Sequence, residues 1–323
     1  MKPEDDYTHP VGSEPNFNES MYFHFHDPGN RIGGFVRLAN RPNEGRGERT
    51  ICLYLPDGRV AFGFARPDVT TNERMAGAGM EFRVDEPFVK LHASFDGEVN
   101  LLDDPEILSE PRELASTVLA RCVAELTFTA LCEPYAHSFD TGGPAFAPNH
   151  YEQIMAVRGS VTVDGNALEI TGTGLRDHSW GPRSWQAPWF YRWVHGSGPR
   201  LAFMGAYFGA ENGAPVTGGF VWDGHEVHHC TDIRISTERS NDQVPRRILV
   251  ELVAPAGKTW RMIGEVRTSV PLRHRNRDAS GREQMTRILE NQTRWTADDE
   301  TELFGMSEYL DQIIDDLPVG LGV

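Results

Sequence analysis

The sequence has few cysteines, and their arrangement excludes two kinds of chemistry. The 4 cysteines, Cys52, Cys122, Cys132 and Cys230, are scattered over 323 residues without the spacing of a metal site or of a redox pair. Isolated cysteines of this kind behave as small, buried apolar side chains. We therefore expect reduced, mostly buried thiols in a cytoplasmic protein.

Positive charge and long apolar runs are also scarce. The 31 Lys and Arg residues are outnumbered by 47 Asp and Glu, for a net charge of -16. Nucleic acids and anionic membrane surfaces attract basic proteins, so this balance argues against either as a partner. No apolar run approaches the ~18 residues of a membrane span, and the acidic segment Met1–Asp6 lacks the apolar core of a secretory signal.

Two catalytic motifs are missing, and a third matches in sequence but not in its expected secondary structure. The sequence has no strand-to-helix glycine loop for a nucleotide phosphate and no nucleophile elbow G-x-S-x-G. His225 and His229 match the zinc-protease pattern H-E-x-x-H, but they follow Asp223-Gly224 in a predicted hairpin strand. Four strand rises of ~3.3 Å would hold the two imidazoles about 13 Å apart, too far to share one zinc. We expect no cofactor and no metal.

What the sequence does contain is a two-residue apolar period with frequent Gly, Pro and Asp-Gly breaks. This pattern is typical of antiparallel β structure. Closing such a sheet would remove its exposed edges and leave an interior able to hold one small ligand. We expect an all-β protein of antiparallel β-barrel or sandwich domains, with one short C-terminal helix at Leu303–Ile314.

The strand pattern occurs twice, in the same order. Residues 21–26 and 32–40 can be aligned with 189–194 and 201–209, and the segment 53–60 can be aligned with 219–227. A Glu-Gln pair then heads a strand-like run late in each half, at Glu152 and Glu283. A long-period repeat of this kind indicates duplicated domains. We predict an N-terminal β domain over residues 1–186 and a C-terminal β domain over residues 187–323.

The segment Arg176–Trp185 lies where the two predicted domains meet. Four of the 7 tryptophans fall between Trp180 and Trp193. If residues 175–181 are extended, Arg176, His178 and Trp180 point to one side and Asp177 points to the other. Such a cluster could be a buried polar network that fixes a domain junction, or it could be a catalytic site.

The catalytic interpretation assigns a role to each group. A carboxyl group near apolar rings has a raised pKa and can act as an acid, which suits Asp177, with His178 as its neighbour or as the acid–base group itself. Arg176 would orient that acid, and a phenol from Tyr207 could position water. Aromatic faces attract cations and could stabilise a carbocation. The candidate aromatic residues are Trp180, Trp185, Tyr191 and Trp193.

The Asp-His-Ser-Trp-Gly core, Asp177–Gly181, precedes an aromatic strand and resembles the motif of the carotenoid 1,2-hydratase (hydroxyneurosporene synthase) family. That group of tandem lipocalin-like proteins also includes cyclase-like and Diels–Alderase-like members. The resemblance implies two lipocalin-like domains, with His178 and Trp180 serving the site. In the family a Tyr followed two residues later by an acid is expected. Here Tyr207 is followed by Gly209.

The nearest acid after Tyr207 is Glu211, so three carboxyl groups remain as alternative proton donors: Asp177, Glu152 and Glu211. We count Glu152 among the substrate-binding residues.

The leading hypothesis is a cofactor-independent hydro-lyase, a hydratase or dehydratase. It would act on a C=C bond or tertiary alcohol of an isoprenoid-like hydrophobic small molecule. One alternative keeps the pocket and changes the reaction to isomerisation or cyclisation, including cycloaddition. The other is a non-catalytic lipid or terpenoid carrier. The expected partners are the hydrophobic small molecule and, as a hypothesis, a second copy of the chain in a homodimer.

Overall fold

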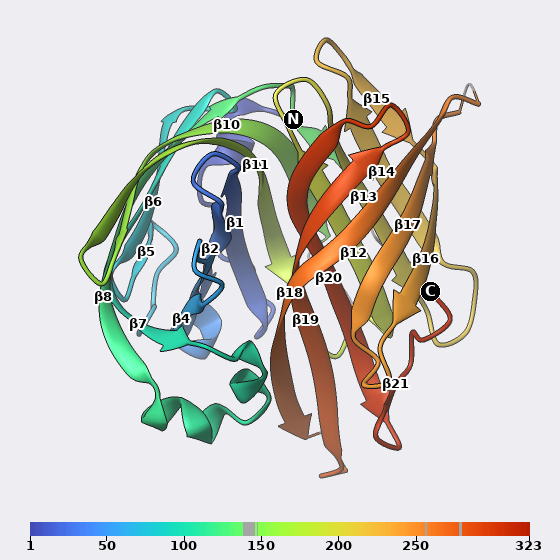
Figure 1. The fold of residues 1–323 in the computed structure, drawn as a ribbon. Coiled ribbons are helices and arrows are strands. Elements are labelled where there is room, and N and C mark those ends of the chain that lie inside the picture. Colours follow the sequence, from blue (N-terminus) through green and yellow to red (C-terminus); the bar gives the residue numbers. More distant parts are fainter. Residues whose placement is uncertain (138–145, 147, 256, 278–279) are drawn as a thin grey trace. The chain divides into compact units, whose positions relative to one another are not determined.

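The computed structural model describes residues 1–137, 146, 148–255, 257–277 and 280–323. It forms two compact units (Figure 1). The described residues of unit 1 lie within 1–104, 112–138 and 147–183, and those of unit 2 lie within 105–111, 139–146 and 184–323. The expected domain boundary after residue 186 stays a prediction.

Unit 1 contains the first eleven strands and three short 3₁₀ segments. The strands are β1 (Phe17–Asp27), β2 (Ile32–Arg41), β3 (Arg46–Tyr54), β4 (Val60–Ala65), β5 (Met75–Gly77), β6 (Met80–Glu86), β7 (Lys90–Leu102), β8 (Val118–Ala130), β9 (Tyr135–Ala136), β10 (Asn149–Val163) and β11 (Asn166–Pro182). The 3₁₀ segments are η1 (Pro3–Asp6), η2 (Pro42–Glu44) and η4 (Pro111–Ser116).

These eleven strands form one antiparallel sheet. Its order is β4-β3-β2-β1-β11-β10-β8-β7-β6-β5, with β9 on β10. An additional pairing of β4 with β7 turns the sheet back on itself, and the strands curve into a nearly closed barrel (Figure 1). Closure of this kind removes strand edges that would otherwise be exposed. The barrel interior is packed with buried apolar side chains, among them Phe23, Phe82, Phe95 and Phe128.

Unit 2 contains the remaining strands and one 3₁₀ segment. The strands are β12 (Phe190–Ser197), β13 (Ala202–Gly209), β14 (Val216–Trp222), β15 (Val227–Cys230), β16 (Asp232–Arg239), β17 (Pro245–Val253), β18 (Thr259–Arg277), β19 (Glu283–Ala297), β20 (Glu302–Ile314) and β21 (Leu317–Pro318). The 3₁₀ segment is η3 (Pro105–Ser109).

Its antiparallel sheet has the order β15-β14-β13-β12-β20-β19-β18-β17-β16, with β21 on β20. Strands β18, β19 and β20 are long and central in this order, and the buried core includes Trp295, Phe203, Tyr309 and Val194.

The internal repeat predicted from the sequence is confirmed by the strand order. In unit 1, β1 lies between β2 and β11, and β11 lies between β1 and β10. In unit 2, β12 lies between β13 and β20, and β20 lies between β12 and β19. The paired segments of the sequence fall on corresponding strands: β1 and β12, β2 and β13, the β3–β4 and β14–β15 hairpins, and β10 and β19. The all-β fold of tandem lipocalin-like domains is therefore correct.

The C-terminal helix expected at Leu303–Ile314 is wrong. These residues form β20, which pairs with β12 on one side and β19 on the other. A central strand covered on both faces is apolar at successive positions, and such a run cannot be told from a buried helix by periodicity. The burial of β20 is nearly continuous, and this explains the error.

Three smaller expectations have clear outcomes. The histidines of the H-E-x-x-H sequence lie at a turn and in strand β15, as the hairpin prediction required. All 4 cysteines are free, and three of them are buried. No helix among the described residues is long and apolar enough to cross a membrane.

Candidate functional site

Strand β11 carries the polar segment and holds it in an extended conformation. It pairs with β1 on one side and with β10 on the other. Gly174 allows close approach to β1, because a Cβ at this position would lie 1.8 Å from the carbonyl oxygen of His24. Arg176, His178 and Trp180 project to the inner face of the barrel, while Asp177 projects to the outer face, as the alternation of a strand predicts.

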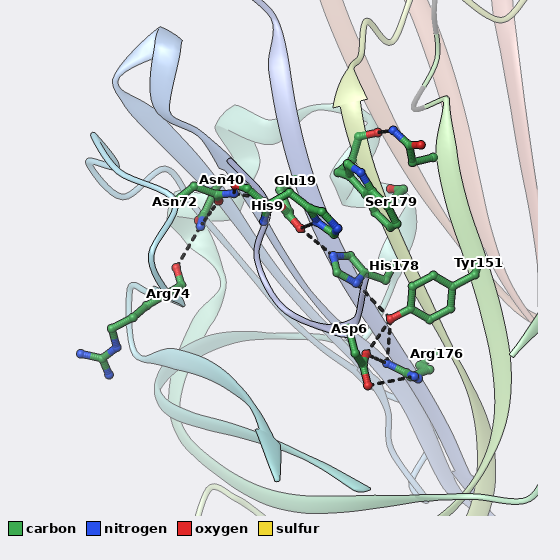
Figure 2. Close-up of polar contacts among 12 residues, drawn as sticks. Asp6, His9, Glu19, Asn40, Asn72, Arg74, Tyr151, Arg176, His178 and Ser179 are labelled. Atoms are coloured by element: carbon green, nitrogen blue, oxygen red, sulfur yellow. Dashed lines mark hydrogen bonds and ion pairs between the residues drawn. The ribbon is translucent and has the colours of Figure 1, made fainter. Parts of the chain in front are cut away.

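On the inner face, Arg176 is the centre of a buried ionic network (Figure 2). Its Nη1 donates to Asp6 Oδ1 of η1, and its Nε and Nη2 donate to Gln153 Oε1 at 2.9 and 2.6 Å. The hydroxyl of Tyr151 donates to Asp6 Oδ1 at 2.6 Å. Arg176 therefore holds Asp6, 170 residues away in sequence, rather than Asp177.

His178 links this network to a second acid (Figure 2). Its Nδ1 lies 3.1 Å from the Tyr151 hydroxyl oxygen, and its Nε2 lies 2.8 Å from Glu19 Oε1. The Tyr151 proton is already donated to Asp6, and the Glu19 carboxylate can only accept. The Nε2 of His178 therefore donates to Glu19, and the side chain is held between a phenol and a carboxylate.

The N-terminal segment covers this network. His9 stacks on Trp180, with the ring centroids 3.8 Å apart, and its Nδ1 lies 2.8 Å from Glu19 Oε1. Asn72 donates to Glu19 Oε2 at 2.6 Å and to the carbonyl oxygen of His9 at 2.8 Å. The segment that contains Asp6 and His9 is thus fixed by several bonds to unit 1.

The electrostatics of the network favour its charged forms. Burial alone would raise the pKa of Glu19, but hydrogen bonds from His178 and His9 outweigh it and lower that pKa to about 2. Burial likewise opposes the ionisation of Asp6, yet the charge and hydrogen bond of Arg176 hold its pKa below the usual range. The two carboxylates, Asp6 and Glu19, are therefore held in their charged forms by Arg176 and by the imidazoles of His178 and His9.

The outer face of the same strands carries a smaller acid–base cluster, which we call the outer triad: His150, Glu152 and Asp177. Glu152 lies directly opposite Asp177 in the pairing of β10 with β11. His150 Nε2 makes a short contact with Asp177 Oδ2 and lies 3.5 Å from Glu152 Oε1. The Glu152 side chain is fully buried, whereas the His150 side chain is 12% exposed and the Asp177 side chain is 14% exposed. Solvent can therefore reach the histidine–aspartate pair.

The two acids set the charge state of His150. Burial favours the neutral imidazole, but the negative charges of Asp177 and Glu152 outweigh burial and raise the pKa of His150. The positive charge of Arg183 opposes this increase only weakly. A protonated histidine beside a carboxylate can donate a proton and later recover it, which are the two steps of acid–base catalysis.

The predicted site residues of unit 1 thus fall into two groups. Arg176, His178 and Trp180 belong to the inner network, and Asp177 and Glu152 belong to the outer triad. Asp177 and His178, expected to share acid–base work, lie on opposite faces of β11.

The four predicted residues of unit 2 lie in or near β12 and β13. Tyr191 and Trp193 share one face of the sheet, and the Tyr191 hydroxyl donates to Glu308. Tyr207 lies opposite Arg192 in the pairing of these strands and therefore faces the other side. Glu211, the third candidate acid, is exposed in the loop after β13. The roles of Tyr207 and Glu211 stay predictions.

Trp185 and Tyr191 belong to an aromatic cluster of unit 2 that also includes Phe146 and Phe208. The ring centroid of Phe146 lies 6.3, 6.0 and 6.1 Å from those of Trp185, Tyr191 and Phe208, respectively. Phe146 and Trp185 remain partly exposed. The cluster offers large apolar faces that a hydrophobic molecule could contact.

Three groups among the described residues have donor atoms close enough to share a metal ion. They are His9–Glu19–His178, His150–Glu152–Asp177 and Asp223–Glu226–His228, each with ligand atoms within 4.8 Å of one another. In the first group, imidazole–carboxylate hydrogen bonds of 2.8 Å use these atoms, which matches an ionic network as well as a metal site.

Sequence reasoning missed His150, Asp6, Glu19 and Tyr151. A signal existed for His150, since it precedes Glu152 by two residues in a predicted strand and so shares its face. Asp6 and Glu19 gave no such signal, because their partners on β10 and β11 are more than 140 residues away.

A domain-family model matches residues 2–313, and its description is Domain of unknown function (DUF7064). The chain belongs to this family. The match covers nearly the whole chain and so includes both units of this DUF7064 protein. No curated protein matches the sequence.

Solved structures resemble the chain at low sequence identity. Kievitone hydratase from Nectria haematococca is 11% identical, with a TM-score of 0.58 and 93% of each chain covered. CghA is 10% identical, with a TM-score of 0.59, over 94% of this chain and 90% of its own. A protein from Nitrosomonas europaea is 12% identical, with a TM-score of 0.60, over 93% and 94%. At these identities the likeness shows a shared fold across both units.

Proposed function

We propose that the protein is a cofactor-independent hydro-lyase acting on a hydrophobic small molecule. It would add water to a C=C bond, or remove it from a tertiary alcohol, of an isoprenoid-like substrate. The observation that carries the proposal is the outer triad. In it a partly exposed histidine, whose pKa is raised, contacts Asp177 and lies 3.5 Å from a buried glutamate. Such a group can protonate a weakly basic carbon or a leaving hydroxyl.

The proposed reaction uses one proton, which the triad donates and recovers. In hydration, protonated His150 gives its proton to one alkene carbon and leaves a cation on the other. Water adds to the cation, and the His150–Asp177 pair takes back one proton from the new C–OH₂⁺ group. Dehydration is the reverse. The buried charge of Glu152 stabilises the imidazolium between turnovers.

Two further observations support a hydrophobic substrate. The aromatic cluster of unit 2 offers apolar faces, and aromatic faces also stabilise cations. Kievitone hydratase, by its name a hydratase, has the same fold. We assign the inner network a positioning role, because both nitrogens of His178 are held by fixed partners.

The experiment is turnover of a panel of terpene alkenes and tertiary alcohols in ¹⁸O-water. Wild type is compared with His150→Gln and Asp177→Asn, each expected to reduce turnover about 10²-fold or more. His228→Gln is the matched control, because His228 also lies beside an aspartate, Asp223, at 2.7 Å but in the β14–β15 hairpin. This variant should keep wild-type turnover.

Each outcome separates the candidate functions. Labelled alcohol, or loss of water, that depends on His150 and Asp177 supports the hydro-lyase. Conversion without label would instead indicate isomerisation or cyclisation. Saturable binding without product, unchanged in both variants, would identify a carrier and overturn the proposal.

A further inference from the structure

Three arginines gather at one end of the inner face of unit 2. Arg192 of β12 and Arg287 of β19 lie in strands that flank β20, and Arg239 ends β16. The guanidinium carbons of Arg192 and Arg239 lie 4.5 and 5.2 Å from the ring centroid of Tyr309. Arg287 lies directly opposite Asp311 in the pairing of β19 with β20. The arginines therefore form one positively charged cluster around Tyr309 and Asp311.

Some of the hydrogen-bond donors of this cluster have acceptors among the described residues, and others have none. Arg192 donates to both carboxylate oxygens of Asp311, at 3.2 and 2.9 Å, and to the carbonyl oxygen of Gly320. Arg239 donates to the carbonyl oxygen of Gln243 and to the terminal main-chain oxygen of Val323, the last residue of the sequence. The Nε atoms of both arginines are buried without an acceptor in the part of the chain that the structure describes.

Arg287 is the least satisfied of the three. Its Nε and Nη2 atoms are buried, and neither has a hydrogen-bond partner among the described residues. Arg273, opposite it on β18, could compete for acids but is already paired with both oxygens of Glu110, at 3.0 and 2.9 Å. Arg287 thus presents at least two buried donors that no acceptor within the described ranges meets.

The charges of the cluster do not balance. Three guanidinium groups lie near two side-chain carboxylates of the described chain: Asp311, which pairs with Arg192, and Glu106, whose charge acts on Arg287 from η3. Burial and the positive charge of Arg192 lower the pKa of Arg239 to about 10. Buried cations of this kind are normally paired, since an unpaired charge and an unmet donor both cost free energy.

We propose that this end of unit 2 is a binding site for a small oxyanion, a phosphate or a carboxylate. An oxyanion supplies the two features that are lacking, negative charge and several hydrogen-bond acceptors. The planar fork of a guanidinium matches both carboxylate and phosphate oxygens. Arg287 is the principal ligand, and Arg239 and Arg192 add charge. The site is independent of the proposed hydro-lyase activity.

The test is a calorimetric titration with inorganic phosphate, and in parallel with acetate, at constant ionic strength. Wild type is expected to bind one anion saturably, and Arg287→Gln and Arg239→Gln to weaken binding at least tenfold. Arg234→Gln is the matched control, because Arg234 lies in β16 but is exposed and paired with Asp232 at 2.7 Å. It should bind as wild type does. Stronger binding of phosphate than of acetate, or the reverse, identifies the preferred oxyanion.

Thermal unfolding gives a second readout. Phosphate several-fold above its Kd should raise the Tm of wild type and of Arg234→Gln by about 2–4 °C, and should leave Arg287→Gln unchanged. No saturable binding by wild type of either anion would overturn the proposal. Equal Tm increases in all variants would indicate a general salt effect and would also overturn it.

Discussion

Each unit buries one arginine that pairs with an aspartate and lies over a tyrosine ring, but the surroundings of the two pairs differ. In unit 1, Arg176 pairs with Asp6 and lies over the ring of Tyr151, at 5.0 Å. In unit 2, Arg192 pairs with Asp311 and lies over the ring of Tyr309, at 4.5 Å. In each case a chain segment outside the main strands adds a bond, from η1 in the first unit and from Gly320 in the second.

The difference lies in what surrounds each pair. In unit 1 the network continues through Tyr151 and His178 to Glu19, so that both carboxylates, Asp6 and Glu19, have hydrogen-bond donors. In unit 2 two more arginines lie around the pair, and buried donors are left without acceptors in the described chain. The network around Arg176 therefore pairs its buried charges within the described chain, whereas the cluster around Arg192 would, in our proposal, bind an additional anion.

The outer faces also differ, although their acids are arranged alike. Glu152 lies opposite Asp177 in unit 1, and Glu290 lies opposite Glu308 in unit 2. The first pair has a histidine against it, His150. In the second pair Glu308 accepts the hydroxyl proton of Tyr191. In our proposal, the carboxylate pair of unit 1 takes part in proton transfer because the imidazole of His150 joins it.

The largest expected effect on stability is that of removing Arg176 from unit 1, and it is compared with the removal of Arg287 from unit 2. Arg176→Gln should lower the free energy of unfolding by about 3–5 kcal/mol, because Asp6 stays buried without its cation. Arg287→Gln should change it little without phosphate, because it removes an excess positive charge. Urea unfolding monitored by circular dichroism compares the two.

The exposed Arg83, paired with Asp85, is the control for the first variant, and Arg83→Gln should unfold at the wild-type urea concentration. Equal losses of unfolding free energy for Arg176→Gln and Arg287→Gln would show that the two arginines are paired to the same extent.

Acid should weaken unit 1 through Glu19. Its folded pKa, about 2, lies below the ordinary value of 4.5, so its contribution is fully present above pH 4.5 and is lost as the pH falls toward 2. That contribution is on the order of 3 kcal/mol. Glu19→Gln should remove this part of the pH dependence, as measured by urea unfolding between pH 3 and 6. An unchanged slope would show that the Glu19 carboxylate is not paired with His178.

The smallest effect concerns the segment that covers the arginine pair of unit 2. A Cβ at Gly320 would lie 2.2 Å from Arg192 Nη2 and 2.6 Å from Asp311 Oδ1, so Gly320→Ala should cost about 1–3 kcal/mol. Gly322→Ala is the matched control, since a Cβ there meets no atom within 4 Å. Thermal unfolding of the two variants tests this, and equal Tm values would show that the segment does not pack on the pair.

The sequence by itself determined the local and repeated features. Two-residue periodicity specified antiparallel strands, and the repeated order of segments specified two similar units. The alternation of an extended strand also placed Arg176, His178 and Trp180 on one face and Asp177 on the other, before any partner was known. These features depend on residues close in sequence, and their physical basis is the pleat of a single strand.

Only the tertiary structure decided which groups meet. Asp6 pairs with a residue 170 positions later, and the outer triad forms because β10 and β11 align His150, Glu152 and Asp177 across a sheet. Pairing across the sheet of unit 2 likewise made β20 a strand, because its neighbours β12 and β19 satisfy its backbone hydrogen bonds. Strand register and chain closure act between distant residues, and neither leaves a signal in the local pattern from which the strands themselves were predicted.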